Sequence, residues 1–361
     1  MSKVTIFANG VSGGGAERVI CELSGELVDK GWDIDLITMS DDKASFNLSD
    51  KVIRFVLLKG NKRAAFLKKI LLRYKALKLY IKKEKTDVFV VFLPHTTIFL
   101  LSMKKYIKVP IIVAERSNPE RYPRHLKILL KIFANRADGF VFQTEASKSW
   151  YGKLTYNKQV SIIPNAINRQ FLKNINGEIR KKKEIVSVGR LHVGKNFEML
   201  IDVFSDIADD YPDYSLTIYG KGPEETALKE KICKLNLEKR INLPGFSTNI
   251  REALLEAKLF VFTSDYEGMP NALMEAMACG LPCISTDFAG GAAKILIEDG
   301  KNGLIVPVGD RVSMADAIRR ILDSNDLADY LANNAIKIKE QLAPEIIYDK
   351  WEQILNDVMS R

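Results

Sequence analysis

Two glutamates eight residues apart, Glu267 and Glu275, are the residues whose type and spacing best suit chemistry. They follow an apolar run, Leu259 to Thr263, that has the composition of a buried strand. A turn rich in Gly, Pro and Asn then leads into a helical stretch from Ala272 to Cys279. A helix N-terminus offers unpaired backbone N–H groups to an anion such as phosphate, whereas carboxylates accept hydrogen bonds from hydroxyls. A ligand with a diphosphate and diols, such as a nucleotide sugar, meets both requirements.

Two cations, Arg190 and Lys195, lie five positions apart in a glycine-flanked loop that follows an expected strand at residues 185–188. A helix is expected after them. Fixed cations in such a loop could neutralise the charge of a leaving diphosphate. Taken without their context, both could equally be solvated surface charges.

The composition is that of a globular protein of two domains. The chain has 361 residues, of which 47% are hydrophobic and 27% charged. Three histidines, and four cysteines without metal-ligand spacing, predict no metal site and no cofactor. No signal peptide is recognisable, and the most apolar stretch, residues 88–103, is too short to span a bilayer. We therefore expect a cytoplasmic protein.

A glycine-rich loop follows the first expected strand, residues 4–8. Gly13, Gly14 and Gly15 open a helix expected at residues 16–27, an arrangement that can accept phosphate. Arg18 stands where a dinucleotide-binding fingerprint would have its third glycine, which argues against a dehydrogenase. The alternative is a glycine turn needed only for close packing of helix on sheet.

The alternation of polar and apolar residues at 33–38 predicts a second strand. Asp33 and Asp35 are two positions apart, so they are expected on one solvent-facing side of it rather than in a metal site.

The positive charge of the protein is concentrated in one segment. Between Lys59 and Lys85 there are eleven Lys or Arg and one Glu, against a net charge of +9 for the whole chain. A helix is expected at residues 64–83, with Lys62, Lys69 and Arg73 along one edge. It could lie on anionic lipid or be a solvated surface helix. No aromatic side chain lies among the lysines on the basic face of this helix, so nucleic acid is not an expected partner.

The string EGMPNALMEAMACGLPCIST, together with GRLHVGKN at residues 189–196, resembles the signature of the retaining glycosyltransferases of family 4, which have the GT-B architecture. The resemblance implies an α/β fold of two Rossmann-like parallel-sheet domains facing a cleft. It implies domains at residues 1–170 for the acceptor and 171–343 for the nucleotide sugar, with a terminal helix at 344–361 crossing back to the first domain.

The same resemblance assigns site residues. Glu267, Arg190 and Lys195 are the implied catalytic residues. The implied donor contacts are Gly15, Gly220, Gly222, Phe246, Glu267, Gly268, Met269, Pro270, Asn271, Ala272 and Glu275, with Pro270 only shaping the turn because it lacks an N–H. Lys294 departs from the family, which usually has an acidic residue there.

In the first domain, the basic helix and the strings TDVFVVFLPHTT and VAERSN resemble the bacterial N-acetylgalactosaminyltransferases that act on polyprenyl-diphosphate-linked glycans. The implied acceptor contacts are Gly14, Glu17, Lys62, Lys69, Arg73 and Arg116. The family often has His where Arg116 stands.

These features together predict a retaining, metal-independent transfer of a hexosyl unit to a lipid-linked or surface-polysaccharide glycan. The expected donor is UDP-N-acetylgalactosamine, and the expected location is the inner face of the cell membrane, through peripheral association with anionic lipid. Two alternatives stay open: a GT-B sugar-nucleotide epimerase or hydrolase, and a basic scaffold that binds membrane or nucleic acid without catalysis.

Overall fold

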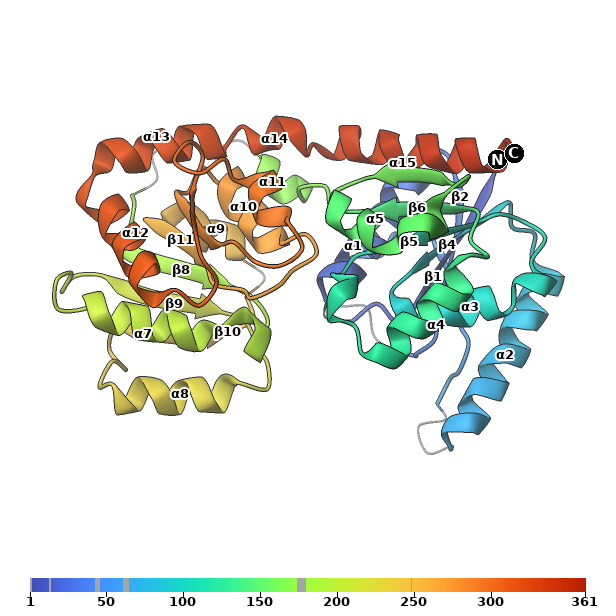
Figure 1. The fold of residues 1–361 in the computed structure, drawn as a ribbon, viewed down its shortest axis with the longest axis horizontal. Coiled ribbons are helices and arrows are strands. Elements are labelled where there is room, and N and C mark those ends of the chain that lie inside the picture. The colour runs from blue at the N-terminus through green and yellow to red at the C-terminus, as the bar shows by residue number, and fades with distance from the viewer. Residues whose placement is uncertain (1, 13, 43–45, 61–64, 174–179, 248) are drawn as a thin grey trace. The chain divides into compact units, whose positions relative to one another are not determined.

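The protein consists of two compact α/β units in a computed structural model (Figure 1). The structure describes residues 2–12, 14–42, 46–60, 65–173, 180–247 and 249–361. The first unit comprises Met1–Ala166 together with Glu345–Arg361, and the second comprises Ile167–Pro344. Gly13 and Lys62, which the sequence singled out, lie outside the described residues.

The first unit contains a seven-stranded parallel sheet in the order β3-β2-β1-β4-β5-β6-β7. Its strands are β1 (Lys3–Ala8), β2 (Asp33–Thr38), β3 (Ile53–Val56), β4 (Val88–Phe92), β5 (Ile111–Ala114), β6 (Gly139–Phe142) and β7 (Gln159–Ile162). Its α-helices are α1 (Gly15–Asp29), α2 (Phe66–Lys83), α3 (Pro94–Ser102), α4 (Arg124–Ala134), α5 (Glu145–Tyr151) and α15 (Pro344–Met359). The strands β4, β5 and β6 have no polar side chains, as is typical of strands that are buried on both faces.

One face of this sheet carries α2, α3, α4 and α5. Its core includes Leu77 of α2, Leu100 of α3, Ala134 of α4 and Tyr151 of α5, packed on the alternate residues of the strands. Such alternation places every second side chain of a strand on the same face.

The prediction that Asp35 faces solvent is wrong. Its side chain is fully buried, 2.9 Å from Lys3 Nζ, and it accepts a hydrogen bond from the Tyr80 hydroxyl of α2. The cause is the position of β2 inside a sheet that helices cover on both faces, so strand alternation no longer separates solvent from core. Among the described residues, no group of His, Cys, Asp and Glu is arranged to hold a metal ion.

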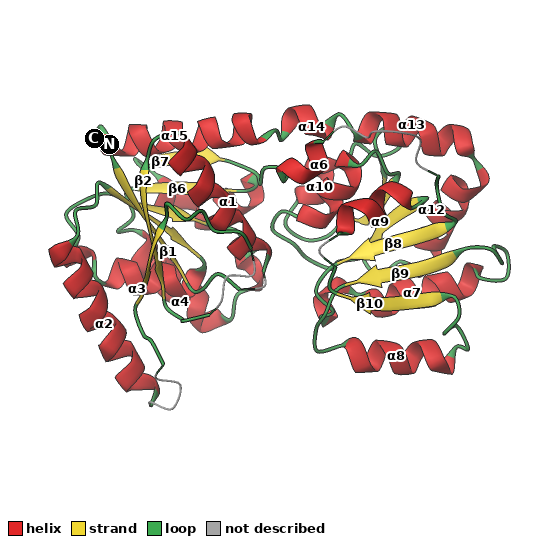
Figure 2. Ribbon diagram, turned by 180° about the vertical axis from the view of Figure 1, so that it is seen from behind, coloured by secondary structure: helices red, strands yellow, loops and turns green. Residues whose placement is uncertain are grey.

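The second unit contains a six-stranded parallel sheet in the order β10-β9-β8-β11-β12-β13. Its strands are β8 (Glu184–Val188), β9 (Ser215–Tyr219), β10 (Ile241–Gly245), β11 (Leu259–Phe262), β12 (Cys283–Thr286) and β13 (Leu304–Val306). Its α-helices are α6 (Arg169–Leu172), α7 (Phe197–Ile207), α8 (Glu225–Lys234), α9 (Ile250–Glu256), α10 (Asn271–Ala278), α11 (Ala292–Leu296), α12 (Arg311–Asp323), α13 (Asn325–Ala335) and α14 (Ile338–Gln341). In Figure 1, α7 lies in front of β8 and β9. Figure 2 shows the molecule from behind, where the same strands face the viewer.

The last helix, α15, packs on the first unit although it is the last element of the chain. Trp351 is almost fully buried, with its ring 6.0 Å from that of Phe92. Lys30, at the end of α1, lies 2.5 Å from Asp349. The first unit is therefore built from both ends of the sequence.

No helix in the described part of the chain is both long and apolar enough to cross a bilayer.

Candidate active site

The second unit has its topological switch point between β8 and β11. These neighbouring parallel strands lead into segments that run to opposite sides of the sheet, since β9 lies beyond β8 and β12 beyond β11. Parallel strands end at the same edge of a sheet, and ligands of open α/β sheets bind at such a point. The loop with Arg190 and Lys195 follows β8, and the loop with Glu267 follows β11.

These two loops meet in an ion pair. Lys195 Nζ lies 2.5 Å from Glu267 Oε1, and the side chains are 22% and 18% exposed. The ammonium also lies 4.9 Å from the centre of the Phe262 ring. An ammonium has three N–H donors, so the hydrogen bond to Glu267 leaves two that could reach a ligand's phosphate oxygens.

Backbone contacts fix the Lys195 loop on β11. Thr263 Oγ1 donates to the Lys195 carbonyl at 2.8 Å, and Asp265 N donates to the Gly194 carbonyl at 3.0 Å. Asn196, which has a left-handed backbone with φ of 51°, donates its Nδ2 to Asp265 Oδ1 at 3.1 Å. Asn tolerates that conformation better than most residues do. The ammonium is thus held in place before any ligand arrives.

Sequence reasoning missed Thr263 and Asp265. Thr263 follows β11 directly and Asp265 comes two residues later, so polar residues after the carboxyl end of a parallel strand were the signal that could have found them.

Arg190 is not part of this ion pair. Its side chain is exposed directly after β8, and it makes no hydrogen bond or ion pair with another side chain in the described part of the structure. The loop that carries Arg190 packs closely against Gly220 and Gly222, which follow β9. A Cβ at Gly220, where φ is +151°, would lie 1.8 Å from the Gly189 carbonyl oxygen, and one at Gly222 would lie 2.0 Å from that of Leu191. Both glycines therefore have a packing reason that does not involve a ligand.

The donor residues predicted around α10 lie on one short turn and the first part of the helix. Gly268, Asn271 and Ala272 are partly exposed, whereas Met269 and Pro270 are buried. Glu275 lies within α10 and is only 4% exposed, so it is much less accessible than the partly exposed Glu267. Phe246, after β10, is strongly exposed. Their ligand roles stay predictions.

Lys294, the departure from the family pattern, forms an exposed ion pair 2.6 Å from Asp287.

In the first unit, the glycine-rich loop lies at the corresponding switch point, between β1 and β4. Gly14 is the N-cap of α1 and Gly15 is its first residue. A Cβ at Gly14 would lie 2.0 Å from Glu17 Oε2, so a carboxylate already lies against the start of the helix. An anion there would meet a negative charge, which favours hydroxyl groups over phosphate at this end of α1.

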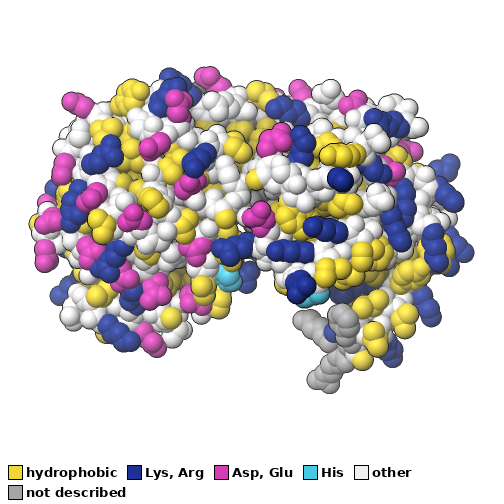
Figure 3. All heavy atoms as spheres, in the orientation of Figure 1, with side chains coloured by type: hydrophobic (Ala, Val, Ile, Leu, Met, Phe, Trp, Pro, Cys, Tyr) yellow, Lys and Arg dark blue, Asp and Glu magenta, His cyan; other side chains and the backbone are white. Residues whose placement is uncertain are grey.

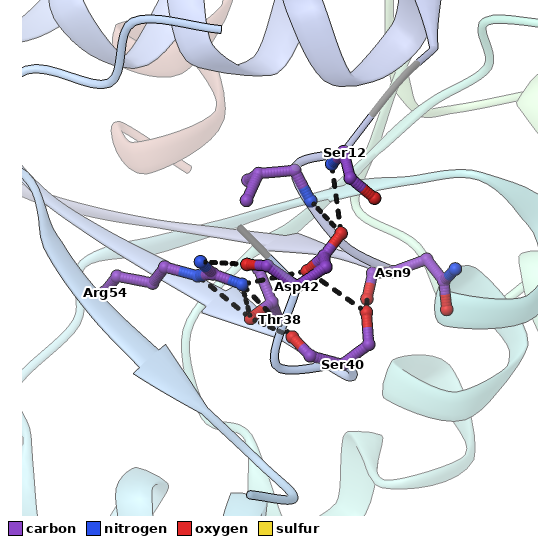
Figure 4. Close-up of polar contacts among 7 residues, drawn as sticks. Asn9, Ser12, Thr38, Ser40, Asp42 and Arg54 are labelled. Atoms are coloured by element: carbon purple, nitrogen blue, oxygen red, sulfur yellow. Dashed lines mark hydrogen bonds and ion pairs between the residues drawn. The ribbon is translucent and has the colours of Figure 1, made fainter. Parts of the chain in front are cut away.

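Asp42 holds the other half of this loop, as Figure 4 shows. Its Oδ2 accepts hydrogen bonds from Val11 N and Ser12 N, both at 3.0 Å, and its Oδ1 lies 2.9 Å from Arg54 Nη2. This contact is not predictable from local sequence, because Asp42 is thirty residues along the chain from Ser12.

Arg116 is buried inside the first unit. Its Nη1 donates to the Ile163 carbonyl at 2.9 Å, and the guanidinium lies 5.1 Å from the Trp351 ring. Burial lowers the pKa of Arg116 to about 10. Its neighbour Glu115 accepts from the hydroxyls of Tyr122 and Tyr151, at 2.6 and 2.9 Å, and burial raises the pKa of that carboxyl. These contacts hold Arg116 in place, but its buried Nε and Nη2 have no hydrogen-bond partner among the described residues. Its acceptor role stays a prediction.

The basic helix α2 packs through Leu77 and Tyr80, both buried. Lys69 and Arg73 are partly exposed, and partial burial lowers the pKa of Arg73. They lie at the edge of the packed face, as the sequence spacing predicts.

Comparison with known proteins identifies the relatives of this chain. A family model described as Glycosyl transferases group 1 matches residues 168–338, and one described as Glycosyltransferase Family 4 matches residues 13–171. The chain is 30% identical to the N-acetylgalactosamine-N,N'-diacetylbacillosaminyl-diphospho-undecaprenol 4-alpha-N-acetylgalactosaminyltransferase of Campylobacter jejuni, over 93% of this chain and 94% of the relative.

A second Campylobacter jejuni protein, the GalNAc-alpha-(1->4)-GalNAc-alpha-(1->3)-diNAcBac-PP-undecaprenol alpha-1,4-N-acetyl-D-galactosaminyltransferase, is 25% identical over 99% of both chains. Among solved structures, Anabaena Alr3699/HepE in complex with UDP and glucose superposes with a TM-score of 0.82 at 18% identity, covering 99% of this chain and 100% of that one.

Proposed function

The chain belongs to the family 4 glycosyltransferases with the GT-B fold, and we propose that it moves N-acetylgalactosamine from a UDP donor to a polyprenyl-diphosphate-linked glycan, with retention and without a metal. The ion pair between Lys195 and Glu267 at the switch point of the second unit is the observation that carries this proposal. The names of the Campylobacter relatives support the choice of sugar and acceptor.

In the proposed reaction, the bond between the sugar's anomeric carbon and the diphosphate oxygen breaks. A hydroxyl oxygen of the acceptor forms the new bond on the same face of the sugar, and its proton passes to the departing diphosphate. Lys195 stabilises the charge that develops on that diphosphate, with Arg190 as a second cation. Glu267 holds Lys195 and accepts hydrogen bonds from donor hydroxyls.

The test supplies the purified protein with UDP-N-acetylgalactosamine, UDP-N-acetylglucosamine or UDP-glucose, with and without a polyprenyl-diphosphate-linked glycan. We expect UDP release and a product heavier by one N-acetylhexosamine with the first donor only, and an α linkage in its NMR spectrum. UDP release without an acceptor product would instead indicate a hydrolase. An inverted linkage would overturn the retaining mechanism.

Association with anionic lipid is the second part of the proposal, and it rests on the outer surfaces of α2 and α4. Seven Lys or Arg lie on α2, two in the 3₁₀ turn at Lys104–Tyr106 and three on α4, and these elements and α3 contain no Asp or Glu. Figure 3 shows dark blue side chains interleaved with yellow ones over α2. An anionic surface complements this charge.

Aliphatic side chains accompany the cations. Leu67 and Leu71 of α2 and Ile128 and Ile132 of α4 are each more than half exposed, and both helices pack on the same face of the sheet. Leu and Ile side chains that alternate with Lys are typical of helices that lie in the headgroup region of a bilayer. Two copies of the chain pressed together here would bring like charges into contact, which disfavours a dimer through this surface.

Vesicle co-sedimentation tests this association. Protein should bind vesicles that contain phosphatidylglycerol and not vesicles of phosphatidylcholine alone. Ile128→Ser together with Ile132→Ser should weaken that binding, whereas Val312→Ser, at a more exposed site on α12, should leave it unchanged. Equal losses in both variants, or binding that does not depend on lipid charge, would refute this surface as the contact.

A further inference from the structure

Gly194, in the turn that carries Lys195, packs against the ring of Tyr266. The turn is a 3₁₀ helix at Val193–Lys195. A Cβ at Gly194 would lie 2.6 Å from Tyr266 Oη, 2.7 Å from Cζ and 2.8 Å from Cε1. These distances are shorter than van der Waals contact, so a methyl group at this position would displace the ring or the turn. The glycine is therefore required by the ring and not by a positive φ.

This contact joins the two segments that carry the ion pair. Lys195 directly follows Gly194 in the chain. Glu267 directly follows Tyr266. A backbone hydrogen bond from Asp265 N to the Gly194 carbonyl, at 3.0 Å, connects the same two segments. A shift of the ring relative to the turn therefore changes the separation of the ammonium and the carboxylate.

The backbone of Tyr266 is anchored by a third loop. It bridges to Ala289, which follows β12. On either side of Tyr266, Ala289 N donates to the Asp265 carbonyl at 3.1 Å and Glu267 N donates to the Ala289 carbonyl at 3.2 Å. These hydrogen bonds do not involve the turn with the lysine. The ring thus extends from an anchored segment and gives the turn a surface to pack on.

The side chain of Lys195 has supports of its own. A Cβ at Gly189 would lie 3.3 Å from Lys195 Cε and 3.4 Å from Cδ, so the aliphatic stem runs along the backbone of Gly189. The ammonium lies 4.9 Å from the centre of the Phe262 ring and is hydrogen-bonded to Glu267. These contacts act on the side chain, whereas the Tyr266 ring acts on the backbone from which the side chain starts.

We propose that Tyr266 is a positioning residue whose ring, packed on Gly194, holds the Lys195 turn where the ion pair with Glu267 can form. The inference rests on the proposed function, in which Lys195 stabilises the charge of the leaving diphosphate. Tyr266 acts on the reaction through that lysine and is not itself a catalytic residue. Because the diphosphate gains charge only as the bond breaks, loss of the ring should slow the chemical step more than it weakens donor binding.

A double-mutant cycle on turnover tests the contact. Tyr266→Ala removes the ring, and Gly194→Ala places a methyl group where the ring lies. Each should lower kcat by about tenfold to a hundredfold through displacement of the ammonium, with little change in KM for the donor. The double variant should lose no more than Tyr266→Ala, since the three atoms nearest to the new methyl group all belong to the ring. Losses that multiply in the double variant would overturn the proposal.

The conservative variant Tyr266→Phe keeps the ring and should restore most of the turnover that Tyr266→Ala loses. A loss in Tyr266→Phe as large as that in Tyr266→Ala would show that ring packing is not the cause. Tyr330→Ala, at an exposed tyrosine on α13, is the control for removal of a tyrosine ring from the same unit, and it should leave turnover unchanged.

A measurement that needs no activity separates this inference from the proposed function. Acetic anhydride acetylates exposed lysines, and mass spectrometry gives the rate at each one. Lys195 and Lys231 are 22% and 21% exposed, so Lys231 is a suitable internal reference. Acetylation of Lys195 relative to Lys231 should be several-fold faster in Tyr266→Ala than in the wild type. This result in a protein that transfers no sugar would support the positioning contact and place the failure in the proposed function.

Gly194→Ala decides the question by the same two measurements if Tyr266→Ala does not fold. Turnover and Lys195 acetylation both equal to those of the wild type, in whichever of these variants is folded by circular dichroism, overturn the proposal.

Discussion

Replacing Lys195 by Met separates the catalytic role of its charge from its role in stability. The substitution keeps an unbranched side chain of similar length over the Phe262 ring and removes the ammonium 2.5 Å from Glu267 Oε1. We expect turnover to fall by about a hundredfold to a thousandfold, as when one charge-stabilising donor is removed from an active site. That loss corresponds to about 2.7–4 kcal/mol of transition-state stabilisation.

The expected loss of stability is smaller. Both side chains of the ion pair are about one-fifth exposed, and solvent screening limits such a pair to about 1 kcal/mol. Loss of the contact between the ammonium and the aromatic ring adds about 0.5–1 kcal/mol. The free energy of unfolding should therefore fall by about 1–2 kcal/mol, well below the effect on the reaction.

Lys231 of α8 offers a matched control in the same unit. Its ammonium lies 2.7 Å from Asp202 and 3.1 Å from Glu198, and its side chain is 21% exposed, close to the 22% of Lys195. Lys231→Met should lower the stability by a similar amount and leave turnover unchanged. Steady-state UDP release and urea unfolding of both variants measure the two effects.

Two results would refute this reasoning. Turnover of a folded Lys195→Met protein equal to that of the wild type would remove the charge from the mechanism. An equal loss of turnover in Lys195→Met and Lys231→Met would show that the activity follows stability and not the charge at the switch point.

Three further substitutions test the surroundings of the site. Gly220→Ala should lower the free energy of unfolding by about 2–3 kcal/mol, measured in urea, because φ is +151° and the new Cβ would meet the Gly189 carbonyl. Arg116→Ala should lower it by about 2 kcal/mol, through lost packing on Trp351 and an unpaired carbonyl; unchanged stability with lost turnover would instead favour acceptor binding. Burial raises the pKa of Glu115, so the wild type should lose stability as the pH rises from the unfolded value, about 4.3, through the raised one. Glu115→Gln should lack this component in unfolding curves measured across that range, and an identical pH dependence in both proteins would contradict it.

Much of the fold is predictable because its elements are local in sequence. The strand expected at residues 33–38 has the same bounds in the structure, and those expected at residues 4–8, 185–188 and 259–263 differ by one residue at one end. Alternation and apolar runs mark such strands without knowledge of their neighbours. Alternation fails at Asp35, because only the helices on both faces of the sheet decide whether a side chain meets solvent.

The candidate site is predictable to the extent that it follows strand ends. Lys195 and Glu267 each lie in a loop after a strand, and the pairing of β8 with β11 brings them together. The burial of Glu275 could not be read from its spacing, since it depends on how α10 packs in the unit. The contacts of Asp42 could not be read from the sequence either. They form only because the fold brings its side chain against Gly10 and Val11, in a loop distant along the chain.

The packing of α15 on the first unit has a consequence for biosynthesis. Glu345–Arg361, which complete that unit, leave the ribosome only after all of the second unit has been made. Until then the surface that receives Trp351 stays uncovered, and the nascent N-terminal half carries an open apolar patch. A polypeptide that lacks the residues from Glu345 onward should therefore fold its second unit, while its first unit attracts chaperones and proteases.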